Sequence, residues 1–326
     1  MSFRPEKRPF RHVSPEQICS NAQSGGGVHI CPILAAYEVA TCTMGARRCV
    51  KTRSGRATMD VSGARHAFVT GGASGIGLGI ADALLKRGIP VTITDVDEEA
   101  LQAVVAARPG ARGQVLDVRD RSAWSFAKAK AEAAFGPVDI LVANAGIGPD
   151  GELLADARPE TFDLIMAINV GGVFNAISAF AGDMRARGTG HIVITASVTG
   201  LVTGQVPRIG TYTASKFAIV ALGEGLRTEM EPHGIGVSTL CPGLVTSNLG
   251  RNTTRLGMPA RKAKLETGRP AGAPQGGMDP AEVGEITIDG IARNLPYIIT
   301  HPDAWPEIEV RWQALAGAFS AAERVE

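Results

Sequence analysis

Apolar positions from His66 onward fall into two alternating patterns. Short continuous apolar runs, typical of buried strands, cover 67–70, 91–94, 114–116, 140–142, 192–195, 237–240 and 297–300. Longer segments with helical spacing cover 76–87, 98–107, 122–135, 159–187, 213–231 and 280–293. Strands that alternate with helices predict parallel strands joined by right-handed crossovers. We therefore expect a single α/β domain built on a doubly wound parallel sheet, with ligands bound at the carboxyl ends of the strands.

The N-terminal stretch 1–58 shows neither pattern. It contains three consecutive glycines at 25–27 and nine Lys/Arg against three Asp/Glu, a net charge of +6. We expect 1–58 to be a disordered extension, with a targeting or regulatory arm as the alternative. The folded domain is expected to span 59–326, and Met59 would make a natural start before the first strand. Within it, the stretch 250–277, rich in Gly, Pro, Arg and Lys, is expected to belong to a mobile substrate loop at about 244–278.

Composition narrows the possible partners. The chain is 44% hydrophobic and 20% charged, an ordinary balance for a soluble domain. Residues 59–326 carry a net charge of −5 and no basic stripe, so we expect no nucleic-acid partner. The most apolar early run, 28–46, is interrupted by Pro32 and Glu38 and falls short of the roughly 20 apolar residues of a membrane helix. We therefore expect no membrane partner.

Cysteine usage is also uneven. Cys241 is the single cysteine of the predicted domain, because the other four lie within the stretch 1–58. No CxxC pair occurs in the sequence, so we expect no metal site. A domain that does not depend on disulfides favours a reducing compartment, and we expect a cytoplasmic protein.

A glycine-rich turn, Thr70-Gly71-Gly72-Ala73-Ser74-Gly75-Ile76-Gly77, follows the first predicted strand and opens the first predicted helix. Glycines at such a turn let the backbone approach a pyrophosphate, and the free N–H groups of the helix start bind the anion. The spacing is GxxxGxG, whereas the common dinucleotide fingerprint is GxGxxG. A turn without a ligand is the alternative. The position after a strand favours a dinucleotide site of the Rossmann type, formed by Gly71, Ser74, Gly75, Ile76 and Gly77.

Asp95 ends the second predicted strand, the next strand after the glycine-rich turn. A carboxylate at this position accepts hydrogen bonds from the adenosine ribose hydroxyls and repels a 2′-phosphate. The glycine-rich turn offers no Lys or Arg that could bind such a phosphate. Asp95 therefore favours NAD over NADP as the cofactor, and a strand-ending turn residue is its alternative role.

Tyr212 and Lys216 are four positions apart, on one face of a predicted helix. A free tyrosine has a pKa near ~10 and is a poor base at neutral pH. A nearby ammonium and the positive nicotinamide of an oxidised cofactor stabilise the phenolate, as general acid/base catalysis requires. Such a pair also occurs by chance on exposed helix faces. Ser197, just past the strand 192–195, is placed to hydrogen-bond a substrate oxygen, or it is an ordinary turn residue.

Taken together, these residues resemble the short-chain dehydrogenase/reductase family over about residues 64–293. The resemblance rests on the order and spacing of Thr70-Gly71-x-x-x-Gly75-x-Gly77, Asp117-Val118, Asn144-Ala145-Gly146, Asn169, Ser197, Tyr212-x-x-x-Lys216 and Pro242-Gly243. Two departures are small. Ala143 stands where many members have a second Asn, and the separation of Ser197 and Tyr212 is slightly greater than the commonest spacing.

The resemblance implies a nicotinamide-dependent oxidoreductase that interconverts an alcohol and a ketone. It implies that Tyr212 passes the proton to or from the substrate oxygen and that Ser197 orients and polarises this oxygen. Lys216 would lower the pKa of the tyrosine and bind the nicotinamide ribose, and Asn169 would hold a water that links Lys216 to solvent. The remaining cofactor contacts are expected from Asp117, Val118, Asn144, Ala145, Gly146, Pro242, Gly243 and Thr246.

The resemblance also bears on assembly and substrate. Family members commonly form dimers and tetramers through the helices that match 159–187 and 213–231, so we expect a homodimer or homotetramer. The stretch 279–301 resembles members that act on bulky secondary alcohols, and enzymes that oxidise benzylic alcohols in lignin-type aryl ethers. We expect the tail aromatics Trp305, Trp312 and Phe319 to pack in the core.

Two alternatives stay open. One is a reductase of ketones or oxoacyl thioesters, a class that more often uses NADPH, and Asp95 argues against it. The other is a non-catalytic dinucleotide-binding sensor. Such proteins usually lose the tyrosine or the lysine, whereas Tyr212 and Lys216 are both present here.

Overall fold

The computed structural model describes residues 61–202, 207–247, 249–256 and 277–322. The predicted extension 1–58 and the segment 257–276 of the predicted substrate loop lie outside the described residues. The predictions for these two stretches therefore remain predictions.

The centre of the domain is a parallel sheet of seven strands in the order β3-β2-β1-β4-β5-β6-β7. Chain order runs outward in both directions from the junction of β1 and β4, as the predicted doubly wound sheet requires. The strands are β1 (Ala67–Thr70), β2 (Val91–Asp95), β3 (Ala111–Val115), β4 (Ile140–Ala143), β5 (His191–Thr195), β6 (Gly236–Cys241) and β7 (Tyr297–Ile299).

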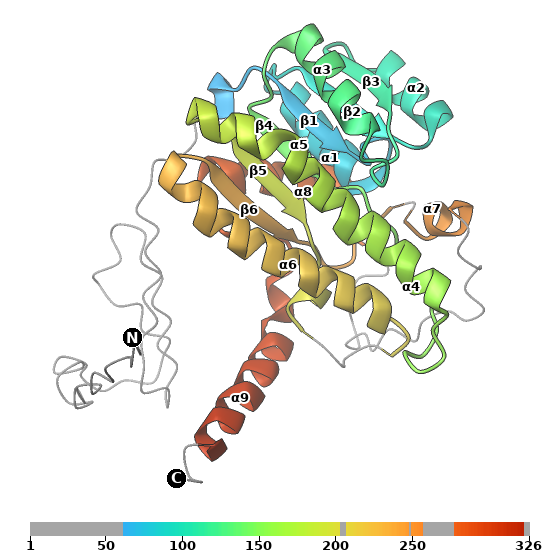
Figure 1. Cartoon of the computed structure of the whole chain (residues 1–326), viewed down its shortest axis with the longest axis vertical. Helices are drawn as coiled ribbons and strands as arrows, with labels where there is room; N and C mark the ends of the chain where they lie inside the picture. Colours follow the sequence, from blue (N-terminus) through green and yellow to red (C-terminus); the bar gives the residue numbers. More distant parts are fainter. Residues whose placement is uncertain (1–60, 203–206, 248, 257–276, 323–326) are drawn as a thin grey trace, which may run out of the picture. The chain divides into compact units, whose positions relative to one another are not determined.

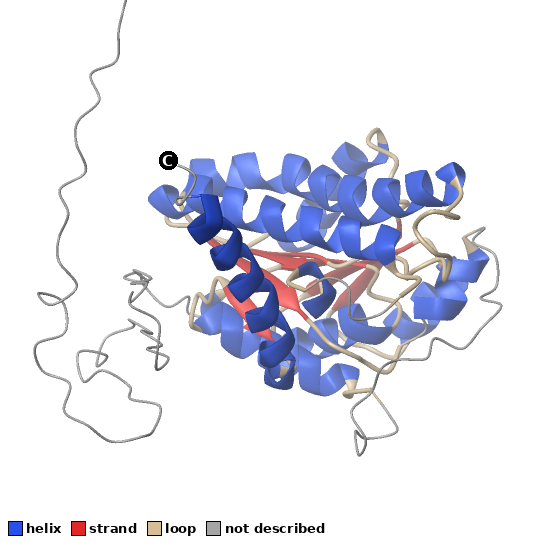
Figure 2. Cartoon of the chain, turned by 90° about the horizontal axis from the view of Figure 1, so that it is seen from below, coloured by secondary structure: helices blue, strands red, loops and turns tan. Residues whose placement is uncertain are grey.

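Helices cover both faces of this sheet (Figures 1 and 2). The described helices are α1 (Gly75–Leu85), α2 (Glu98–Ala106), α3 (Ala123–Phe135), α4 (Pro159–Ile165), α5 (Gly172–Arg187), α6 (Gly210–Met230), α7 (Leu249–Arg255), α8 (Pro280–Ala292) and α9 (Trp305–Ala322). Local capping explains where several begin. Asp97 accepts a hydrogen bond from the Ala100 N–H at the start of α2, and Asp279 does the same for Ala281 at the start of α8.

Two apolar cores lie on the two faces of the sheet because side chains alternate along each strand. Phe68 and Leu141 face the core under α3, α5 and α6. Their neighbours Val69 and Val142 face the other core, under α1, α2 and α8. Burial on both faces explains why these strands appear in the sequence as continuous apolar runs.

The segment 159–187, predicted as one helix, contains a π-helical turn at Met166–Gly171 between α4 and α5. By length and composition this segment could span a membrane, and half of its most apolar window is buried. Its buried side chains, Phe180 among them, pack in the core on the sheet. We therefore interpret its apolar character as that of a core helix.

Three predictions about the elements were incomplete or wrong. β3 begins at Ala111, before the predicted 114, because this edge strand is only partly buried and has no continuous apolar run. Part of the predicted loop forms α7. The tail forms α9, where Trp305, Trp312 and Phe319 are exposed, so the expectation of core packing was wrong.

Candidate active site

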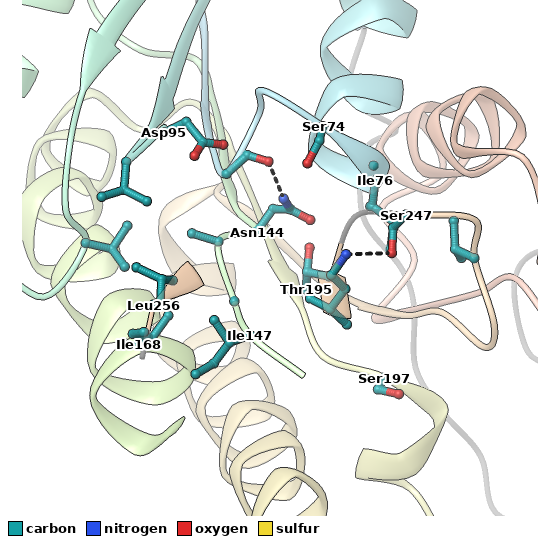
Figure 3. Close-up of a pocket in the computed structure, with 18 of the residues that line it drawn as sticks. Ser74, Ile76, Asp95, Asn144, Ile147, Ile168, Thr195, Ser197, Ser247 and Leu256 are labelled. Atoms are coloured by element: carbon teal, nitrogen blue, oxygen red, sulfur yellow. Dashed lines mark hydrogen bonds between the residues drawn. The ribbon is translucent and has the colours of Figure 1, made fainter. Parts of the chain in front are cut away.

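Most of the predicted site residues come together in one cleft at the carboxyl ends of the strands, near the junction of β1 and β4. Figure 3 shows Asp95 and Ser74 toward one end of this cleft and Ser197 toward the other. The predicted residues that line it are Gly71, Ser74, Gly75, Ile76, Asp95, Asp117, Val118, Asn144, Ala145, Gly146, Ser197, Tyr212, Lys216, Pro242 and Gly243. Gly77, Asn169 and Thr246 are predicted residues outside this lining.

The glycine-rich turn between β1 and α1 is packed tightly against the end of β4. Gly71 has a φ of +63°, a conformation that favours glycine, and a Cβ there would lie 2.8 Å from the Ala145 Cα. A Cβ on Gly77 would lie 2.6 Å from the Asn144 Nδ2 and would overlap the Gly71 carbonyl. Gly77 therefore serves helix–strand packing, whereas the backbone at Gly71 and Gly75 lines the cleft.

Thr70 and Asn144 join the ends of β1 and β4. The Thr70 Oγ1 accepts hydrogen bonds from the Asn144 N–H (2.9 Å) and from the Ala145 N–H (3.0 Å). The Asn144 side-chain amide donates to the Thr70 carbonyl at 3.0 Å. These bonds tie the end of β1 to the end of β4 at the floor of the cleft.

Two carboxylates stand at the predicted adenosine end. The Asp95 Oδ2 accepts from the Ala73 N–H of the glycine-rich turn (3.1 Å), and its Oδ1 accepts from the Asp97 N–H (3.1 Å). Asp95 thus shapes the turn as well as lining the cleft. Asp117 forms an ion pair with Arg119 at 2.6 Å, and hydrogen bonding to Arg119 lowers the pKa of Asp117.

Ser197, Tyr212 and Lys216 lie at the other end. Ser197 follows β5, and its hydroxyl accepts from the Thr199 N–H (3.2 Å) and donates to the Pro242 carbonyl (3.3 Å). The Lys216 Nζ donates to the Thr195 carbonyl at 3.1 Å and lies 5.5 Å from the centre of the Tyr212 ring. The structure therefore brings a hydroxyl, a phenol and an ammonium to one wall of the cleft.

Burial dominates the pKa values of this group in the protein alone. Burial raises the pKa of Tyr212 to about 12, and a hydrogen bond with Ser197 acts in the opposite direction. Burial lowers the pKa of Lys216 to about 8, against a smaller raising effect of the nearby Cys241. Ser197 and Lys216 alone therefore do not give the lowered tyrosine pKa expected from the sequence, because the phenolate loses more hydration than they restore.

Asn169 lies behind the cleft, in the π-helical turn, and is fully buried. Its Oδ1 accepts from the Ile147 N–H at 2.8 Å. Its amide group donates to the Ile147 carbonyl (3.1 Å) and to the Ser215 Oγ (3.0 Å). The Asn169 side chain thus joins the segment after β4 to α6. Its contact on α6 is Ser215, the residue before Lys216.

Thr246 also differs from its expected position. Its hydroxyl donates to the Gly277 carbonyl (3.1 Å) and its N–H donates to the Met278 carbonyl (3.0 Å), which closes the base of the predicted substrate loop. Val245 and Ser247, on either side of it, line the cleft instead.

The predicted substrate loop contributes to the cleft through α7, but sequence reasoning did not predict this helix or a contact of Arg255. Leu249, Arg255 and Leu256 line the cleft, and Arg255 forms an ion pair with Asp97 at the end of β2. The Thr253 Oγ1 accepts from the Gly148 N–H at 2.8 Å, which ties α7 to the segment after β4. No local spacing signals contacts between residues so far apart in the chain.

The shape and chemistry of the cleft fit a dinucleotide cofactor. Glycines form a cradle that side chains would fill, and Gly75 and Ile76 of the first turn of α1, where helices bind anions, line the cleft. The buried Thr195 Oγ1, on a residue that lines the cleft, has no hydrogen-bond partner among the described residues. A buried hydroxyl of this kind is ordinarily paired, so it is a ready partner for a polar ligand.

The short chain dehydrogenase family model matches residues 65–255, which is more than half of the chain. The chain belongs to the short-chain dehydrogenase/reductase family. The match runs from the start of β1 to the end of α7, and so includes the whole cleft except for residues after 255.

Individual relatives agree with this assignment. A C alpha-dehydrogenase from Sphingobium sp. (strain SYK-6) is 34% identical over 273 residues, which cover 79% of this chain and 87% of that protein. The 2-(S)-hydroxypropyl-CoM dehydrogenase 3 of Xanthobacter autotrophicus is 37% identical over 211 residues, 62% of this chain and 82% of that protein. A short chain dehydrogenase/reductase from Burkholderia phymatum, solved in complex with NAD, is 29% identical with a TM-score of 0.70 and coverages of 79% and 96%. This short-chain dehydrogenase/reductase is therefore an oxidoreductase with a small-molecule substrate.

Proposed function

We propose that this chain is an NAD-dependent dehydrogenase that interconverts a secondary alcohol and a ketone, with Tyr212 as the general acid/base. The observation that carries the proposal is the convergence of Ser197, Tyr212 and Lys216 in one cleft, which the glycine-rich turn and Asp95 also line. When bound, the nicotinamide cofactor supplies the hydride chemistry. Everything else in the reaction is positioning and proton transfer by the chain's own residues.

The positions of these residues support the roles that the family resemblance implies. Ser197 has a hydroxyl that lines the cleft and can orient a substrate oxygen, and the Tyr212 hydroxyl gives or takes the proton of that oxygen. Lys216 keeps a cation beside the Tyr212 ring and is held in place by the Thr195 carbonyl. Asn169 supports the backbone of Tyr212 through Ser215. The Ser215 Oγ accepts from the Asn169 amide and donates to the Tyr212 carbonyl at 2.7 Å.

We propose NAD as the preferred cofactor because Asp95 stands at the end of β2, where the adenosine ribose binds in such sheets. Its carboxylate would accept ribose hydroxyls and repel a 2′-phosphate. Arg119, a cation that lines this end of the cleft, is engaged with Asp117. The Burkholderia phymatum relative that was solved with NAD supports this choice.

For the substrate we propose a bulky hydrophobic or benzylic secondary alcohol. The name of the Sphingobium relative, C alpha-dehydrogenase, agrees with the resemblance noted in residues 279–301. The apolar residues Ile147 and Leu249 line the cleft and would contact an apolar substrate better than a small polyol.

Assembly and location complete the proposal. We propose a homodimer or homotetramer formed through the helices of 159–187 and α6, since Phe162 and Phe174 are exposed apolar side chains on α4 and α5.

We propose a cytoplasmic location because Cys241, the single cysteine after residue 58, is a free buried thiol that needs no oxidising compartment.

The test is nicotinamide absorbance with the purified chain, using NAD or NADP and a series of aliphatic, steroidal and benzylic secondary alcohols. We expect turnover with NAD, strongest on benzylic or other bulky alcohols, and its loss in Tyr212→Phe. Equilibrium binding of NADH to the same variant is the control, because the phenol ring is retained. Activity on small polyols but not on aryl or hydrophobic alcohols would refute the substrate class. Tight NADH binding without turnover on any alcohol or ketone would refute the proposal that the chain is an enzyme.

A further inference from the structure

The last helix, α9, carries its largest apolar side chains on one face. Trp305, Ile308, Trp312, Leu315 and Phe319 follow one another at intervals of three, four, three and four positions. This alternation is the a/d spacing of helices that pack along a common line of contact. We call these five residues the α9 seam.

Most of the α9 seam faces outward. Figure 1 shows α9 extending away from the sheet and from the helices that cover it. Ile308, near the base, is buried, whereas Trp312 is 57% exposed and Phe319 is 74% exposed. The base of α9 is anchored on the body, because the Arg311 guanidinium stacks over the Phe217 ring of α6 at 4.9 Å. The described part of the chain thus fixes where α9 begins and leaves its outer half uncovered.

The charge of α9 bears on what covers this surface. From Trp312 to Ala322 the helix has no charged residue, and Glu307, Glu309 and Arg311 lie in its first two turns. A continuous exposed apolar surface marks an interaction site. Helices that bind lipid surfaces carry Lys and Arg along the polar face, and α9 has two glutamates against one arginine. The outer half of α9 is uncharged, so two copies of it do not repel each other electrostatically.

The spacing of the α9 seam is nearly symmetric about Trp312. Trp305 and Phe319 lie seven positions before and after it, and Ile308 and Leu315 lie four before and three after. In an antiparallel pair of α9 helices centred on Trp312, Trp305 of each copy therefore meets Phe319 of the other. Ile308 is buried within its own chain and takes no part in this contact. This orientation also opposes the two helix dipoles favourably and places the two folded bodies at opposite ends of a pair about 27 Å long.

We propose that α9 is a homotypic docking helix that pairs antiparallel with α9 of a second copy, around a two-fold axis at Trp312. A two-fold contact of one surface with itself is the commonest form of subunit interface. The inference does not depend on the proposed catalytic function, and it adds a contact to any made through the helices of 159–187 and α6.

Sedimentation velocity of the full chain tests the contact with two matched variants. Trp312→Glu places two carboxylates opposite each other at the axis, whereas Ala314→Glu adds the same charge on the opposite face of α9. We expect Trp312→Glu to halve the mass of the assembly and Ala314→Glu to keep the wild-type mass. Equal masses for the wild type and Trp312→Glu, or equal losses in both variants, would overturn the proposal. NADH binding by each variant shows that the body remains folded.

Disulfide cross-linking tests the orientation. In the full chain with Cys19, Cys31, Cys42 and Cys49 replaced by serine, Trp312→Cys places one thiol from each copy at the axis. We expect mild oxidation to link Trp312→Cys into a covalent dimer and to leave Leu315→Cys unlinked, because the two copies of residue 315 lie on opposite sides of the axis, six positions or about 9 Å apart along the pair. Thiols must come within a few ångströms to bond. Equal linkage of the two variants indicates a parallel pair and overturns the antiparallel arrangement, and linkage of neither overturns the contact.

Discussion

The Lys216 ammonium lies 5.5 Å from the centre of the Tyr212 ring, and the two residues share one face of α6 beside the end of β5. The chain thus holds a cation next to the phenol, yet burial still keeps the pKa of Tyr212 at about 12. A second positive charge is needed to bring this pKa toward neutral pH. In the proposed function, that charge is the ring of the oxidised cofactor.

The first prediction follows from this need for a second charge. Binding of NAD⁺ is expected to lower the pKa of Tyr212 well below 12, whereas binding of NADH, whose ring is neutral, is expected to leave it high. Ultraviolet difference absorbance of tyrosinate during an alkaline titration measures the shift. Tyr212→Phe must abolish the NAD⁺-dependent component, since Tyr37 and Tyr297 are present in both proteins. Equal titration curves with and without NAD⁺ would contradict the proposed tuning.

The second prediction concerns the cost of burying Lys216. Its pKa is lowered from 10.5 to about 8, so the unfolded chain binds more protons between these values and stability rises with pH there. Lys216→Met removes a penalty of roughly 3 kcal/mol at pH 7 and loses one hydrogen bond to Thr195 of about 1 kcal/mol. We expect the variant to be inactive yet more resistant to urea at pH 7. Its advantage should shrink toward pH 10, and a variant less stable at every pH would contradict the account.

The sequence predicted the sheet well because strands buried on both faces, such as β4 and β5, must be apolar along their whole length. It also predicted most of the cleft, because glycines that touch a ligand or a neighbouring strand occur at fixed spacing after β1. Such signals are local in the chain. The Arg255–Asp97 pair joins residues 158 positions apart, and no periodicity encodes it. The α9 seam is visible in the sequence as helical spacing, but spacing alone does not distinguish a face covered by the same chain from one covered by another.

The third prediction tests cofactor choice at Asp95. Asp95→Asn keeps an oxygen acceptor but removes the charge, and its amide no longer accepts both the Ala73 and Asp97 N–H groups. We expect kcat/KM for NAD to fall by about tenfold, since one charge-assisted hydrogen bond contributes roughly 1.5 kcal/mol or more. We expect kcat/KM for NADP to fall less than kcat/KM for NAD, or to rise, because the repulsion between Asp95 and the 2′-phosphate is relieved. Equal losses with both cofactors would instead indicate that Asp95 only shapes the turn.

The fourth prediction concerns the contact of α7 with the end of β2. Arg255 and Asp97 form an ion pair at the rim of the cleft, between partly exposed side chains. Arg255→Gln should weaken nucleotide binding by up to about fivefold at low salt, as expected for an exposed pair of at most ~1 kcal/mol. The difference should disappear in high salt, where such pairs are screened. Arg293→Gln is the matched control, because its pair with Asp289 lies at the end of α8, outside the cleft lining. An Arg255→Gln effect that persists at high salt would contradict the ion-pair explanation.

The fifth prediction separates the structural and catalytic roles of Asn169. Asn169→Ala leaves the Ile147 N–H and carbonyl without their side-chain partner, and unpaired buried groups cost about 1–3 kcal/mol each. We expect the free energy of unfolding to fall by roughly 2–5 kcal/mol in urea titrations. Ser215→Ala removes the third bond of Asn169 and keeps the two to Ile147, so its loss should be nearer about 1 kcal/mol. Because Ser215 also contacts the Tyr212 carbonyl, both variants should lower kcat more than they raise KM. A stability loss in Asn169→Ala with unchanged kcat would assign Asn169 to the fold alone.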